Sequence, residues 1–295
     1  MTCRWQGALV VLALLALLAI TAGCTETPAE DRCRVADDGR LSLSLAGGGD
    51  RSIEVLERDG NFSLSRAVFS SGGVPVTAYI GAPARPAAVG IVYVPGANEP
   101  VSGHRDRFRR YADAGIAFLY LDVRGNGFET PGARTDLGAE YREFERGGFP
   151  QSYRVIADIL RARALLAEEF GPATTWAVGS SNGGRYAAVA AAIEPAFAGY
   201  AGVSTSGYGD LSGLDAGPRQ FIASLDPASM IGVISPRPVL VYHAGADPVI
   251  PFADGEALFE AARDPRTFVP FSGQHGIDPV VDADLIGRLT QVYGR

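Results

Sequence analysis

The sequence predicts an α/β fold, in which helices flank a mostly parallel sheet and antiparallel strands extend its N-terminal side. Residues 89–292 alternate short, continuous apolar runs with segments of helical periodicity, which is the pattern of β-α-β units. Residues 41–80 instead alternate single apolar and polar residues between glycine-containing breaks, as antiparallel strands do when one face is exposed. Both patterns fit a single domain over 41–295, with 41–66 as an N-terminal β extension.

The composition suits such a domain and argues against several functions. The 295 residues are 47% hydrophobic and 20% charged, which allows a large core. The net charge is −7 and every positive side chain is an arginine, which argues against nucleic-acid binding. Without lysine there is no Walker A site, and three histidines and three cysteines argue against a structural zinc site. We expect neither a metal nor an organic cofactor.

Residues 1–24 have the features of an export signal. Arg4 and the amino terminus are positive, Ala8–Ile20 is apolar, and small residues precede Cys24. This ending resembles the lipobox of prokaryotic lipoproteins, with Thr21 where that family usually has leucine. The resemblance implies lipidation of Cys24, and we expect an exported protein that is membrane-anchored or secreted.

Two alternatives stay open for this segment. An uncleaved leader could itself anchor the chain, although its apolar run is short for a membrane span. Without lipidation, Cys24 and Cys33 could form a disulfide in an oxidising compartment. The polar residues 25–40 that follow are expected to be a tether.

The elements after the tether follow from their periodicity. Short antiparallel strands are expected over 41–80, with a turn at 71–73. Buried parallel strands are expected over 89–94, 116–121, 198–203, 238–242 and 267–271, and helices over 106–114, 151–170, 252–262 and 280–292. Arg107, Arg109 and Arg110 are expected on a solvated helix face. Residues 128–150 and 204–235 show no clear period, and whether they cover a site is left open.

The stretch Thr174–Ile193 is the centre of the predicted fold. An apolar run breaks at Gly179 and continues as an alanine-rich helix, and residues 179–183 (G-S-S-N-G) match G-x-S-x-G. At a sharp strand-to-helix turn, the residues two before and two after a nucleophile must lack side chains, or they collide with each other and with the neighbouring strand. We therefore expect Ser181 to be a nucleophile; the alternative is a serine in an ordinary glycine-rich turn.

A serine nucleophile needs a base, and His275 is the best placed of the three histidines. It lies in the loop after the last predicted strand, and loops at the carboxyl ends of parallel strands build active sites in such sheets. His104 opens a helix and is expected to be a capping or surface residue, and His243 ends a strand and is expected to be structural.

The base in turn needs an orienting carboxylate and the oxyanion needs two backbone donors. Asp247 follows a strand between Ser181 and His275 in a loop stiffened by glycine and proline, which favours it as the carboxylate. One donor is expected to be the amide of Asn182, next to the nucleophile. The other is expected from the loop after strand 89–94, from Ala97 or, slightly less favoured, Asn98.

Three features together resemble the α/β-hydrolase superfamily. They are the order of Ser181, Asp247 and His275 along the chain, the G-x-S-x-G turn at 179–183 (the elbow), and an Asp-x-Arg-Gly-x-Gly turn over 122–127. The likeness covers roughly residues 67–292. It implies that fold and hydrolysis, and it says almost nothing about substrate.

Within that superfamily, the stretch Arg237–His243 with Asp247 and Pro251 looks most like dienelactone-hydrolase and prolyl-oligopeptidase-related esterases. True dienelactone hydrolases use cysteine where this chain has Ser181, and the N-terminal part is too short for an oligopeptidase propeller. The expected function is therefore a serine-dependent hydrolase of small-molecule carboxylic esters. The alternatives are a peptidase or amidase with the same triad, or a non-catalytic surface-anchored binding protein.

Overall fold

The computed structural model describes residues 30–293. The leader and Cys24, the expected lipidation site, lie outside the described residues. Among the helices that are described, none is both long and apolar enough to cross a membrane.

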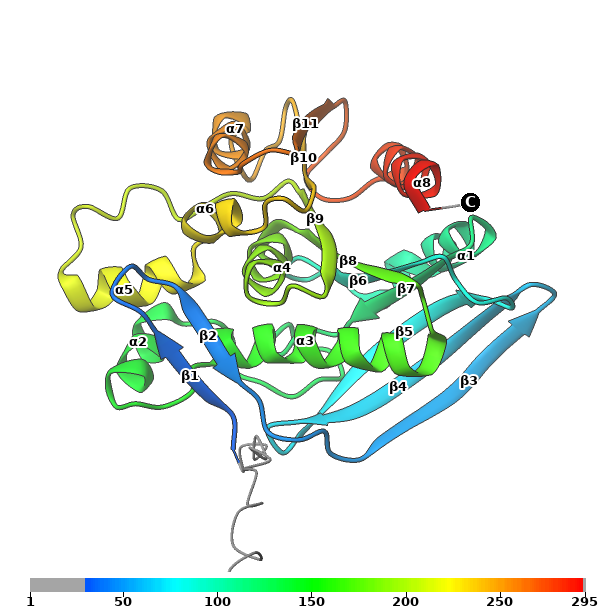
Figure 1. Cartoon of the computed structure of the whole chain (residues 1–295), viewed down its shortest axis with the longest axis horizontal. Helices are drawn as coiled ribbons and strands as arrows, with labels where there is room; N and C mark the ends of the chain where they lie inside the picture. Colours follow the sequence, from blue (N-terminus) through cyan, green and yellow to red (C-terminus); the bar gives the residue numbers. More distant parts are fainter. Residues whose placement is uncertain (1–29, 294–295) are drawn as a thin grey trace, which may run out of the picture.

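A nine-stranded sheet organises the domain (Figure 1), with the strand order β11-β10-β9-β8-β6-β7-β5-β4-β3. Neighbouring strands are parallel from β7 through β6 and β8 to β11, whereas β5 pairs antiparallel with β7 and continues into an antiparallel meander. The strands are β3 (Arg51–Asp59), β4 (Phe62–Ser71), β5 (Val74–Pro83), β6 (Val89–Val94), β7 (Ile116–Leu121), β8 (Thr174–Ser180), β9 (Phe197–Val203), β10 (Val239–Ala244) and β11 (Arg266–Phe271). The predicted mostly parallel sheet with antiparallel N-terminal strands is confirmed.

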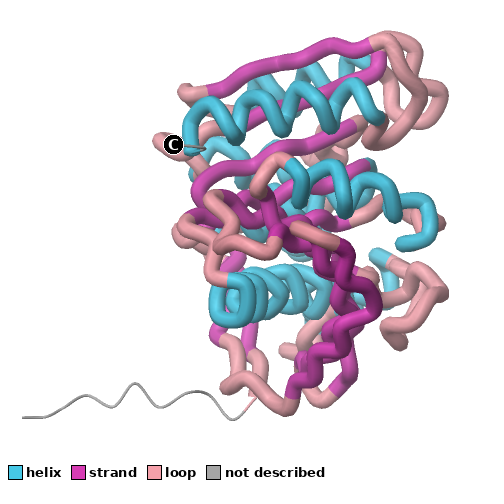
Figure 2. Tube along the Cα trace, turned by 90° about the vertical axis from the view of Figure 1, so that its right-hand side faces the viewer, coloured by secondary structure: helices cyan, strands magenta, loops and turns pink. Residues whose placement is uncertain are grey.

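Helices cover both faces of the sheet, and the magenta strands run among cyan helices in the orthogonal view of Figure 2. They are α1 (Arg105–Asp113), α2 (Leu137–Glu145), α3 (Gln151–Phe170), α4 (Ser181–Ile193), α5 (Ala216–Leu225), α6 (Pro227–Met230), α7 (Phe252–Ala261) and α8 (Pro279–Tyr293), with 3₁₀ turns η1 (Val101–His104) and η2 (Ile231–Val233). Alternate residues of each buried strand belong to two separate cores. In β6, Ile91 and Tyr93 pack with α1 and α8, whereas Val92 and Val94 pack with α3 and α4.

Two segments without clear period contain helices that the sequence analysis did not predict. In the first, α2 is capped by Asp136, whose carboxylate accepts the Ala139 amide at 3.0 Å. Its apolar residues Leu137, Tyr141 and Phe144 recur at helical spacing and pack against the core, but the charged residues between them hide the pattern. In the second segment, α5 and α6 precede β10.

The prediction of a tether over 25–40 is wrong for Arg32–Val35, which form strand β1. This strand pairs antiparallel with β2 (Leu41–Ser44) around a turn in which Gly39 has φ +81°. The hairpin forms because Cys33 and Val35 alternate with arginines and pack their side chains against the core.

Candidate active site

The strand-to-helix turn at Ser181 has the predicted elbow geometry. β8 ends at Ser180, α4 begins at Ser181, and Ser181 has φ +52°, in the left-handed region that side chains rarely adopt. A Cβ on Gly179 would lie 2.5 Å from the carbonyl oxygen of Gly183, and one on Gly183 would lie 2.2 Å from that of Val94. The steric reason for the two glycines is thus confirmed: they avoid each other and the neighbouring strand.

Asp247 and His275 meet at the carboxyl edge of the sheet, in the loops that follow β10 and β11. Both carboxylate oxygens of Asp247 lie 2.9 Å from Nδ1 of His275. Oδ1 of Asp247 also accepts the amides of Val249 at 2.8 Å and Ile250 at 2.9 Å. Burial acts to raise the pKa of Asp247, but these amides, His275 and Ser204 outweigh burial and hold the pKa below its usual value. The carboxylate is therefore ionised at neutral pH.

The ionised carboxylate determines which nitrogen of His275 carries the proton. Asp247 can only accept, so Nδ1 must donate, and in the neutral imidazole the lone pair is then on Nε2. The His275 loop (residues 272–278) also lies next to the elbow: a Cβ added to Gly276 would be 3.4 Å from Oγ of Ser180. The expected base thus lies beside the turn that carries the expected nucleophile.

The β6 loop (residues 95–100) packs directly on that nucleophile. A Cβ on Gly96 would lie 3.1 Å from Cβ of Ser181, and Asn98 has φ +57°. Gly96 donates its amide to Glu99, whereas the amides of Ala97 and Asn98 have no acceptor within the described part of the chain. Asn182 lies in the first turn of α4, where amides lack helical partners. This arrangement leaves the expected donors Asn182 and Ala97, or Asn98, available to an anion.

Several residues near the site differ from their expected roles. Arg107 is only 8% exposed, so the prediction that it lies on a solvated face is wrong; Arg109 and Arg110 are partly exposed. His104 is buried and makes no capping hydrogen bond, so its expected capping or surface role is also wrong. His243 is buried, and its Nε2 contacts the carbonyl oxygen of Ile250 at 3.0 Å, in keeping with a structural residue.

Two further side chains at the site were not singled out from the sequence. Thr205 Oγ1 donates to the carbonyl oxygen of Ser181 at 2.7 Å, and Glu99 accepts the Gly96 amide at 2.7 Å. The position of Glu99 in a predicted strand-end loop was the only available signal, although its partners Tyr93, Gly96 and His104 lie within six residues of it. Among residues 30–293, no group of three or more histidine, cysteine or acidic side chains is placed to hold a metal ion.

Several solved structures with the same architecture are described as esterases. An acetyl xylan esterase from Paenibacillus sp. R4 superposes with a TM-score of 0.66 and 15% identity, over 82% of this chain and 88% of that one. A cold-adapted esterase from an Arctic intertidal metagenomic library gives a TM-score of 0.59 and 20% identity, over 80% and 96%. The chain has the α/β-hydrolase fold. Est1E from Butyrivibrio proteoclasticus aligns with this chain at a TM-score of 0.56 and 14% identity, over 78% of this chain and 99% of that one.

The sequence similarity to curated proteins covers a short part of this chain. No family model matches it. A stretch of 65 residues is 42% identical to the uncharacterized protein YfhR of Salmonella typhi and of Salmonella typhimurium. The match spans 21% of this chain and only 20% of the length of those relatives.

Proposed function

We propose that this protein is a serine-dependent hydrolase of carboxylic esters that works through an acyl-enzyme intermediate. The observation that carries the proposal is the pair of 2.9 Å contacts between Asp247 and Nδ1 of His275, in a loop that lies next to the elbow of Ser181. A serine hydroxyl becomes a nucleophile when an oriented imidazole accepts its proton.

In this mechanism Ser181 Oγ attacks the acyl carbon while Nε2 of His275 takes the proton. His275 then returns that proton to the leaving alcohol, and in the second half-reaction it activates the water that releases the acid. Asp247 fixes the tautomer and stabilises the imidazolium. The amides of Asn182 and Ala97 donate to the tetrahedral oxyanion.

Ester substrates are favoured over amides by the solved structures that share the fold, which are described as esterases. A peptidase or amidase would use the same residues, and a non-catalytic binding protein would not need the Asp247–His275 pair. A small-molecule ester is therefore the proposed substrate class.

We also propose that the protein is exported and attached to a membrane through a lipid on Cys24, with secretion as the alternative. The motif of residues 1–24 supports this proposal. Asp31, near the start of the described residues, is bound by Arg161 of α3 at 2.6 Å. At most about 25 Å of extended chain can therefore separate Cys24 from the domain surface.

A series of p-nitrophenyl esters of increasing acyl length, run beside peptide anilides, tests the activity. We expect ester hydrolysis that falls by about 10⁶ in Ser181→Ala, as for the nucleophile of subtilisin, and that changes little in Ser180→Ala. Both variants remove one hydroxyl from neighbouring residues, so each controls for the other. Loss of activity in Ser180→Ala alone would mean that Ser180, and not Ser181, is the nucleophile. Cleavage of the peptide anilides alone would favour the peptidase.

A further inference from the structure

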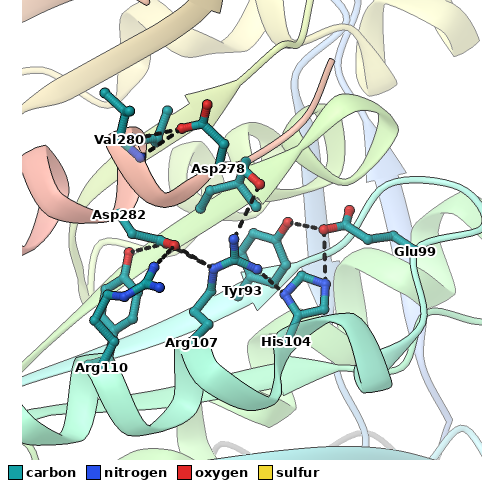
Figure 3. Close-up of polar contacts among 11 residues, drawn as sticks. Tyr93, Glu99, His104, Arg107, Arg110, Asp278, Val280 and Asp282 are labelled. Atoms are coloured by element: carbon teal, nitrogen blue, oxygen red, sulfur yellow. Dashed lines mark hydrogen bonds and ion pairs between the residues drawn. The ribbon is translucent and has the colours of Figure 1, made fainter. Parts of the chain in front are cut away.

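A chain of largely buried polar contacts connects the β6 loop to the His275 loop (Figure 3). It starts at Glu99, whose Oε2 accepts the Gly96 amide at 2.7 Å. Oε1 accepts the hydroxyl of Tyr93 at 2.7 Å and lies 3.0 Å from Nε2 of His104. The hydroxyl of Tyr120 donates to the backbone carbonyl of Glu99. Glu99 is thus held by three side chains and in turn holds the loop that packs on Ser181.

His104 passes the connection to Arg107 of α1. One guanidinium nitrogen of Arg107 contacts Nδ1 of His104. Because a guanidinium can only donate, Nδ1 must accept, so the proton is on Nε2 and is donated to Glu99. Hydrogen bonds therefore run in one direction, from Arg107 through His104 to Glu99.

The other side of Arg107 holds the segment that follows His275. Its Nε donates to Asp282 of α8 at 2.8 and 3.1 Å, and another nitrogen donates to the carbonyl oxygen of Ile277 at 3.2 Å. Ile277 is two residues after His275. Asp282 is fully buried, and Arg110 and Tyr111 also donate to it, at 2.7 and 3.1 Å. One guanidinium thus ties α1 to the His275 loop and to α8.

The hydrogen-bond and ion-pair partners of Glu99 and Arg107 favour the charged forms of both side chains. Burial acts to raise the pKa of Glu99, but His104, Tyr93 and the Gly96 amide outweigh it and hold the pKa below its usual value. Burial likewise lowers the pKa of Arg107, but the Asp282 carboxylate raises it by more. A buried ionic network is weak evidence for stability alone, because apolar residues of similar volume often stabilise a core as well or better.

We propose that this network sets the position of the oxyanion donors relative to His275, with Glu99 and Arg107 as positioning residues. The inference rests on the proposed function. Glu99 accepts the hydrogen bond of the Gly96 amide and so holds the β6 loop, in which Asn98 has a left-handed backbone conformation. Arg107 holds the His275 loop through its hydrogen bond to the carbonyl oxygen of Ile277. Donors and base act on the same tetrahedral intermediate, so a shift of about 1 Å between them can cost about 10²-fold in rate.

The first test compares Glu99→Gln with Glu57→Gln. Glu57 of β3 also bonds to α1, through Arg105 and Arg109 at 2.9 and 2.8 Å, but makes no hydrogen bond to the β6 loop. We expect Glu99→Gln to lower kcat by about 10- to 100-fold with KM nearly unchanged, because oxyanion contacts act in the transition state. The control should keep the parent kcat. An equal effect of both variants, or a change in KM alone, would overturn the proposal.

The second test needs no catalytic activity. Amide hydrogen exchange is measured over the β6 loop and the His275 loop in the parent, Glu99→Gln and Arg107→Lys. Lysine keeps the charge but cannot reach His104, Ile277 and Asp282 together. We expect each variant to speed exchange in both loops, although Glu99 does not bond to the His275 loop. Faster exchange in only the directly bonded loop would disprove the coupling between the two loops. If the parent did not hydrolyse esters, the proposed function would be rejected, but the exchange result would still decide whether the loops are coupled.

Discussion

At the scale of single residues, neighbouring groups fix the backbone conformation of Ser181 and the tautomer of His275 in the candidate site. Ser181 has φ +52° and is the first residue of α4. Asp247 holds the imidazole of His275 with Nε2 free to accept a proton. The sequence predicted these three residues because each belongs to a local motif at a strand end. The tautomer needed the structure, because it depends on which His275 nitrogen meets Asp247.

Asp247→Asn tests the role of the carboxylate. An asparagine can hold the wrong tautomer of His275, so we expect kcat to fall by roughly 10⁴, as in the serine-protease triad. The lowered pKa of Asp247 also has a consequence for stability. A carboxylate whose pKa is lower in the folded state stabilises the protein above its unfolded pKa of about 3.9, and this stabilisation is lost as the pH falls through the folded value.

The unfolding midpoint of Asp247→Asn should therefore lie below that of the parent at pH 7, and the gap should narrow below about pH 4. Thermal unfolding followed by circular dichroism from pH 7 to pH 3 measures this gap. A gap that stays constant over that range would show that the ionised carboxylate does not contribute to stability.

At the scale of helices and strands, the buried parallel strands could be predicted from their apolar periodicity. The buried ion pair between α1 and α8 was missed. The parallel strands were found because every residue of β6, β7 and β10 is buried. In α1, Arg107, Phe108, Tyr111 and Ala112 form one buried helical stripe, and an arginine in such a stripe signals a buried partner. That partner, Asp282, is 175 residues away in sequence, so the ion pair could not be predicted.

Gly183→Ala tests the close packing of α4 against the β6 loop. The added Cβ would lie 2.2 and 2.3 Å from the carbonyl oxygens of Val94 and Pro95, so either the helix or the loop must move. We expect a kcat loss of about 10²-fold and a destabilisation of about 1–3 kcal/mol.

The matched control is Gly287→Ala in α8, where a Cβ meets no atom within 4 Å. This change should leave kcat unaltered and raise the unfolding free energy by about 0.5–1 kcal/mol, because alanine favours helix more than glycine does. Ester kinetics and urea unfolding measure both variants. Normal kinetics for Gly183→Ala would mean that the elbow tolerates a shift of this size.

At the scale of the whole molecule, the sheet separates two cores and carries the site at its carboxyl edge (Figure 1). The β1–β2 hairpin joins the domain through Asp31 and Arg161, although the sequence favoured a tether there. The hairpin was missed because strand β1 has only four residues, two of them arginines. The expected export leader and lipid anchor remain predictions.

Cys24→Ser tests the proposed anchor. Without a lipid on this residue, the protein should appear in the soluble exported fraction or accumulate as unprocessed precursor, because acyl chains supply about 0.8 kcal/mol of membrane binding per buried CH₂. Fractionation of cells that express the parent, Cys24→Ser and the control Cys33→Ser measures this. A correctly processed Cys24→Ser protein that stays in the membrane fraction would contradict the lipoprotein proposal.

The most direct test of Ser181 as the nucleophile is covalent labelling with a serine-directed fluorophosphonate, followed by peptide mapping. The probe forms a stable bond only with a serine that is activated by a base and supported by an oxyanion site. We predict one label per chain on Ser181, no label in Ser181→Ala, and much slower labelling in His275→Ala. A folded parent protein that does not label, or that labels at another serine, would contradict the assignment of Ser181 as the nucleophile.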